Sequence, residues 1–156
     1  MGYEIRAYIG KTVRSYPEWQ LTDVPYPDGS GFHPARDEHG KVMHTDRTEH
    51  PFLVYAMVDM CKLGYQDDPL NDLIGKSFRL AKERPKDVHF FYGSDGNTPI
   101  KEDSYGAAMH PVPLAELAAA MAAMPDMSYR RLGWIKALID AMAGDQEQLS
   151  VMFFGY

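Results

Sequence analysis

Residues 51–85, PFLVYAMVDMCKLGYQDDPLNDLIGKSFRLAKERP, decide the fold of this chain. The first part, 52–61, is a nearly unbroken apolar run in which Asp59 is the single charge. Such a run, rich in β-branched and aromatic residues, predicts a strand covered on both faces. A buried helix is the alternative, which the composition disfavours. Asp59 near the strand end is either a catalytic carboxylate or a structural one, and the structural role is favoured.

The second part predicts an amphipathic helix that begins at Pro69 and ends before Pro85. Asp68 suits the N-cap, and Pro69 fits the first helical position because its missing N–H has no intrahelical partner there. The apolar positions follow helical spacing: Leu70, Leu73, Ile74, Phe78 and Ala81. Residues 87–92, DVHFFY, predict a second strand, parallel to the first, which completes a βαβ unit.

The flanking segments extend this unit into one domain over residues 1–156. Residues 3–9 alternate as in a half-exposed strand. Pro113 begins a second helix, Ser128 caps a third, and residues 149–154 form a last strand. The apolar face predicted for the third helix is Leu132, Ile135, Leu138, Ile139 and Met142. We therefore expect a single-domain α/β or α+β fold: a mixed sheet of about four main strands, one βαβ unit, and a C-terminal helical hairpin leading to the last strand.

The composition excludes several classes of protein. With 45% hydrophobic and 24% charged residues, the chain is typical of a globular domain. We expect it to stay in the cytoplasm, with no membrane contact, because it has neither a long apolar run nor a signal-peptide pattern. A net charge of −6 disfavours nucleic-acid binding, and one cysteine excludes an internal disulfide.

A long irregular insertion, at about 13–51, interrupts the domain with prolines and turn residues. Connections in compact domains are usually about 4–6 residues long, so an insertion of this length is expected to be either functional or mobile. Four histidines lie in it among carboxylates: His33, His39, His44 and His50. They are candidate metal ligands, but their spacing matches no metal motif, so chance histidines in a polar loop are favoured and no metal or cofactor is expected.

The insertion also carries large aromatic residues outside any periodic apolar stripe. These are Tyr16, Trp19, Tyr26 and Phe32. Tyrosine and tryptophan are common anchors of protein interfaces, so these four residues are the candidate partner-binding set. Packing of the insertion onto the domain is the alternative explanation.

Signatures of catalysis are weak. Neither GxxxxGK[ST], GxGxxG nor GxSxG occurs. Glu102 and Asp103 beside Tyr105 could form an acid–base pair, but neighbouring residues in an extended chain point opposite ways, and a solvated loop is favoured.

Several blocks together resemble small accessory proteins of tailed bacteriophages, a group without an assigned activity. The blocks are MVDMCKLGYQDDPL (57–70), EDSYGAAMHPVPLAELAAAM (102–121), YRRLGWIKALIDAM (129–142) and LSVMFFGY (149–156). The resemblance covers the C-terminal two thirds of the chain and carries no catalytic residue with it. It implies a phage protein made in the cytoplasm of a host bacterium.

The sequence therefore favours a non-enzymatic accessory protein that binds a protein partner, expected to be of the host, and that could modulate or inhibit a host system. A small metal-dependent hydrolase using the loop histidines is the alternative. A homo-oligomeric structural component is the third reading.

Overall fold

A computed structural model describes residues 3–13, 24–25, 27–30, 32–33, 38–40, 48–63, 69–124 and 130–156 of the chain. The elements, in chain order, are β1 (Tyr3–Thr12), β2 (Val24–Pro25), β3 (Phe32–His33), β4 (Thr48–Leu63), α1 (Pro69–Glu83), β5 (Asp87–Tyr92), β6 (Pro99–Ile100), β7 (Val112–Pro113), α2 (Leu114–Ala122), α3 (Arg130–Ala143) and β8 (Ser150–Gly155).

The main sheet has six strands in the order β6-β5-β4-β1-β8-β7. β4 and β5 run parallel, with α1 between them in the chain, so the predicted βαβ unit is confirmed. The other neighbours in this sheet are antiparallel. The fold is thus a single-domain α+β fold with a mixed sheet and three helices, as the sequence predicts. β2 and β3 form a separate two-stranded sheet.

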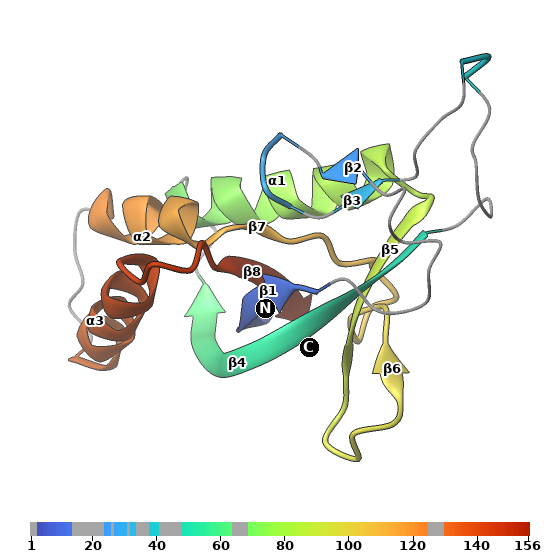
Figure 1. Ribbon diagram of the computed structural model, residues 1–156. Coiled ribbons are helices and arrows are strands. Elements are labelled where there is room, and N and C mark those ends of the chain that lie inside the picture. Colours follow the sequence, from blue (N-terminus) through green and yellow to red (C-terminus); the bar gives the residue numbers. More distant parts are fainter. Residues whose placement is uncertain are drawn as a thin grey trace.

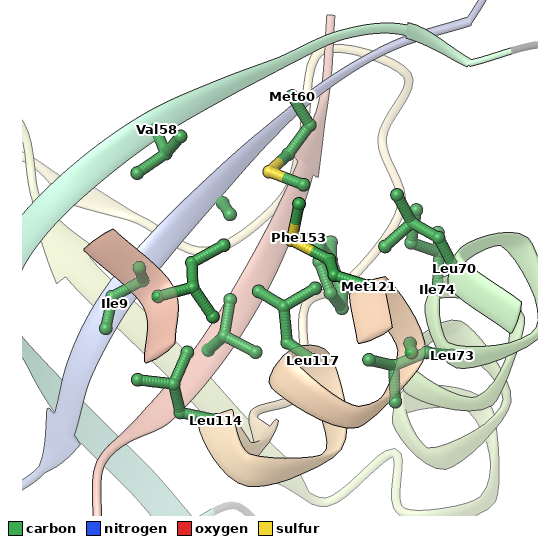
Figure 2. Packing of buried hydrophobic residues seen from close by; sticks show 14 of the residues in the cluster. Ile9, Val58, Met60, Leu70, Leu73, Ile74, Leu114, Leu117, Met121 and Phe153 are labelled. Atoms are coloured by element: carbon green, nitrogen blue, oxygen red, sulfur yellow. The ribbon is translucent and has the colours of Figure 1, made fainter. Parts of the chain in front are cut away.

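The helices pack on one face of the sheet, which places the main core between them (Figure 1). Ile5, Ala7 and Ile9 of β1 are fully buried, as the alternating pattern predicts. They meet Leu70, Leu73 and Ile74 of α1 and the apolar side of α2 in one cluster, which Figure 2 shows with Phe153 at its centre. The helical periodicity of 69–83 therefore identified the correct buried face, although Phe78 is only partly buried at its edge.

β4 is longer than expected and changes faces along its length. It begins at Thr48, so the irregular insertion ends before residue 48 and not at 51. The pairing with β1 shifts where Ile9 faces Ala56 and Gly10 faces Val54, which leaves Tyr55 as an extra residue. A β-bulge of this kind reverses which alternate side chains face the core.

The bulge gives the other sheet face a core of its own. Val58 and Met60 pack under the helices, whereas Phe52 belongs to a second cluster with Phe91, Met109 and Met152. Leu53, Tyr55 and Met57 are exposed, so the prediction that the strand is covered on both faces is wrong. The physical reason is that the helices pack on the face of Val58 and Met60 and the small second cluster covers Phe52 on the other face, so each face of β4 is covered over only part of its length.

Among the described residues, no helix combines the length and the apolar character needed to cross a membrane.

Candidate functional site

Three buried histidines from separate parts of the chain lie in contact. His50 of β4 and His89 of β5 are register neighbours on parallel strands, and their rings stack with centroids 4.8 Å apart. His110, which precedes β7, meets His89 edge-on at 4.5 Å. Each of the three is no more than 2% exposed. We call these three residues the histidine cluster.

One end of the histidine cluster faces a turn of the insertion. The Nε2 atom of His110 lies 3.0 Å from Oγ of Ser30 and 3.3 Å from Nη1 of Arg84, the residue after α1. Arg84 also donates to Ser30 Oγ at 2.9 Å and pairs with Asp28 at 3.3 Å. Ser77 of α1 donates to the carbonyl oxygen of His110 at 2.6 Å, which fixes the backbone there.

Asp28 and Ser30 are the points where this turn is attached. The Ser30 backbone N–H and hydroxyl both donate to Asp28 Oδ1. Partial burial acts to raise the pKa of Asp28, but the bonds from Ser30 and the charge of Arg84 outweigh it, so this pKa lies below its ordinary value. We call Asp28, Ser30, Arg84 and His110 the clasp.

At the other end, Asp87 is buried beside His50, with Oδ1 of Asp87 3.5 Å from Nε2 of His50. Between the two ends, His89 has no hydrogen-bond partner for either ring nitrogen among the described residues. A cavity of about 60 Å³ borders it, lined in part by Asp87, Lys101 and Glu102.

Burial keeps the rings of His89 and His110 neutral. Desolvation, followed by the neighbouring His110, holds the pKa of His89 well below the usual 6.5. Desolvation and the Arg84 cation lower the pKa of His110 to about 4. The Arg84 guanidinium can only donate, and its 3.3 Å contact with Nε2 of His110 places a permanent positive charge beside that ring.

The chemistry open to this arrangement is limited. The rings of His50 and His89 stack instead of converging, and no group of three or more His, Cys, Asp or Glu in the described part of the chain is arranged to hold a metal ion. Ser30, His110 and Asp28 do not form a nucleophilic triad either, because Asp28 binds Ser30 and not the histidine. Ser30 is also fully buried, which closes it to a substrate.

The histidines proposed as metal ligands are not seen together. His39 is exposed and pairs with Glu38 at 3.4 Å, whereas His50 is buried in the histidine cluster. His33 pairs through its backbone with Val24, and its side chain lies outside the described part, as does all of His44.

The carboxylates considered for catalysis have structural partners. Asp59 accepts from the Tyr156 hydroxyl at 3.0 Å. Asp103 is buried and its carboxylate accepts from the amides of Tyr105 and Ala107 at 2.9 Å and from that of Gly155 at 3.3 Å. Glu102 is exposed. Asp103 therefore holds a turn to the end of β8, and it is not a solvated loop residue.

An exposed apolar stripe runs along α3. Trp134 is 67% exposed and Leu138, one turn later, is 44% exposed. Ala137 and Ala141 continue this exposed side at helical spacing. The core side of α3 is formed by Ile135 and Ile139, so the prediction that Leu138 packs inward with them is wrong. We call Trp134, Ala137, Leu138 and Ala141 the α3 stripe.

The aromatic set predicted to bind a partner falls outside what the structure describes. Tyr16, Trp19 and Tyr26 are not among the described residues, and of Phe32 only the backbone in β3 is described. That set stays a prediction.

Sequence reasoning missed His89, His110 and Trp134. The available signal was a lone histidine inside each of two apolar stretches, HFFY and MHPV, and a tryptophan one position away from a helix core stripe.

The chain matches no protein-family model, no curated protein and no solved structure.

Proposed function

We propose that this chain is a non-enzymatic protein-binding factor that docks through the α3 stripe. The observation that carries the proposal is Trp134, two-thirds exposed on a well-formed helix with Leu138 beside it. Tryptophan is strongly enriched among the residues that dominate binding energy. Burying both side chains against a partner would remove apolar area from water that the isolated chain leaves exposed.

The spacing of the stripe suits a helix that lies in a groove of the partner. Anchors at i, i+4 and i+7 are the pattern by which an amphipathic helix is recognised in this way. Asp145 is exposed just after the C-terminal end of α3, whereas Asp140 already pairs with Lys136, and the chain carries a net charge of −6. We expect an apolar groove with basic residues at its rim.

The resemblance to accessory proteins of tailed bacteriophages supports a host protein as that partner, and it supports a role in modulating or inhibiting a host system. The structural roles of Asp59 and Asp103 favour binding over catalysis, because they occupy the carboxylates that the sequence offered for acid–base chemistry.

The test is capture of bacterial proteins by tagged wild-type chain, followed by affinity measurement with the purified partner. The double variant Trp134→Ala/Leu138→Ala should weaken the affinity by roughly 30-fold or more, the equivalent of one hot-spot residue of about 2 kcal/mol. Tyr92→Ala is the matched control, since Tyr92 is similarly exposed on β5 and should leave binding unchanged. Both variants must keep the wild-type circular dichroism spectrum.

A second variant separates the two candidate surfaces. Trp19→Ala/Tyr26→Ala removes two members of the aromatic set of the insertion. Loss of binding in this variant, with full binding in the α3 variant, would move the docking surface to the insertion. Wild-type dimers that the α3 variant dissociates, seen by light scattering, would instead identify a second copy as the occupant and overturn the proposal of a host partner.

A further inference from the structure

The clasp joins the turn 28–30 of the insertion to the domain through Arg84 and His110. Ser30 is fully buried, and its hydroxyl contacts both Arg84 and the ring of His110. Asp28 is the carboxylate that pairs with Arg84. The turn 28–30 is thus seated on a surface made by the end of α1 and the segment before β7.

We propose that the histidine cluster is an acid-sensitive latch, which holds the turn 28–30 on the domain while His110 is neutral and releases it when His110 gains a proton. The inference is independent of the α3 stripe, because it concerns the attachment of the insertion and not the docking helix.

The groups around His110 make its charged form unfavourable in the closed arrangement. A second cation would lie 3.3 Å from the Arg84 guanidinium and in ring contact with buried His89. Among the described residues, Asp28 is the carboxylate that acts on this ring, and it already accepts hydrogen bonds from Arg84 and Ser30. Asp87 lies at the far end beside His50. Lys101 and Glu102 border the cavity at His89, with Lys101 paired to Glu49.

Release of the turn 28–30 relieves the repulsion between protonated His110 and Arg84, because it exposes Nε2 of His110 to water. The closed form depresses the pKa of His110 to about 4, from an ordinary 6.5. The closed form is therefore favoured above pH 6.5 and loses that advantage as the pH falls from 6.5 towards 4. For complete rehydration of His110 alone, the opening equilibrium between pH 7.5 and pH 5 should rise by at most roughly 25-fold. Asp28 keeps its charge throughout this range, because its pKa lies below the ordinary value of an aspartate.

Hydrogen–deuterium exchange of the segment 27–30 tests the latch in the full chain, with rates divided by the intrinsic rate at each pH. On passing from pH 7.5 to pH 5, the wild-type segment should exchange about 10- to 25-fold faster. The amides of β1 and β8 should stay protected, which separates local release from global unfolding. His110→Gln, which cannot be protonated, should show no such acceleration.

Two matched variants complete the test. His39→Gln removes an exposed histidine outside the cluster and should retain the full acid response. Asp28→Asn weakens the pairing with Arg84 and should give fast exchange at both pH values. An acid response of the same size in His110→Gln, or no response in the wild-type segment, would overturn the latch.

One measurement does not depend on any variant folding. The ring Cε1–H signal of His110 in the NMR spectrum of wild-type protein reports its titration directly. In the closed form this ring should titrate near 4, well below 6.5, while the exchange of the segment already accelerates as the pH falls below 6.5. A midpoint for His110 near 6.5, with the segment still protected at pH 5, would contradict the proposal.

Discussion

Asp103 shows how one buried carboxylate can look catalytic in sequence and be structural in space. It accepts three backbone amides, from Tyr105, Ala107 and Gly155, and so connects the turn at 103–107 to the end of β8. A buried amide that loses its acceptor costs about 1–3 kcal/mol. Asp103 therefore lies beside Glu102 and Tyr105 because it stabilises a turn. The hydrogen bonds from the three amides allow its carboxylate to be buried.

Replacing Asp103 should accordingly reduce stability and not a reaction rate. We expect Asp103→Asn to lower the free energy of unfolding by about 1–3 kcal/mol, because its amide group cannot accept from Gly155 and Tyr105 at once. Urea denaturation measures this change. Glu102→Gln, on the exposed neighbour, is the control and should stay within about 0.5 kcal/mol of wild type. Equal losses in both variants would show that the bonds to Asp103 are not what stabilises the turn.

Gly10 is the second residue on which the arrangement depends. A Cβ atom at this position would lie 1.8 Å from the carbonyl oxygen of Leu53, at the bulge where β4 changes faces. That contact is with backbone, which cannot rotate away, so the strands would have to separate locally.

A pair of glycine variants tests this close approach. Gly10→Ala should destabilise the protein by roughly 3 kcal/mol or more, since it combines overpacking with loss of the β1–β4 pairing. Gly75→Ala lies in α1 with nothing within 4 Å of the new Cβ, and should stabilise by about 0.5–1 kcal/mol through helix propensity. Thermal or urea unfolding of the two variants measures the expected loss of stability in Gly10→Ala and the expected gain in Gly75→Ala. A neutral Gly10→Ala would mean that the bulge does not require glycine.

At the scale of elements, periodicity predicted the existence of the helices and the βαβ unit, because α1 has one apolar stripe and clear terminal residues. It failed where an element is apolar on more than one side. Leu138 and Ile135 are both three or four positions from other apolar residues of α3, and only the packing against α2 and β4 decides which of them is buried. The same holds for β4, where the bulge at Tyr55 lets one apolar strand serve two clusters.

The candidate site was less predictable than the fold. His50, His89 and His110 are separated by 39 and 21 positions, and their contact depends on the parallel register of β4 and β5 together with the path of the chain before β7. Nothing in the local sequence of either strand specifies that register. The exposed side of α3 was equally hidden, because a tryptophan in a helix is more often a core residue than a surface one.

For the whole molecule, the histidine cluster ties together elements that are distant in sequence: the end of α1, the first residues of β4 and β5, and the segment before β7. Its neutral form is therefore coupled to global folding as well as to the local clasp. Unfolding returns His110 and His89 to water, where their pKa values return to about 6.5.

Global stability should consequently fall in acid before the carboxylates titrate. Desolvation and Arg84 depress the pKa of His110 to about 4 in the folded chain, so between pH 6.5 and 4 the unfolded chain binds more protons. The stabilisation from this residue is complete above pH 6.5 and decreases as the pH falls, by about 3 kcal/mol in total. Near pH 5 the free energy of unfolding should change by roughly 1 kcal/mol per pH unit because of His110, and His89 should add a change in the same direction. Urea denaturation at pH 7.5, 6 and 5 measures this slope.

His110→Gln should reduce the slope by the contribution of one proton, whereas His39→Gln should leave it unchanged because that ring is exposed. A wild-type protein equally stable at pH 7.5 and 5 would show that the cluster accepts protons without cost, and its burial would then have no influence on folding.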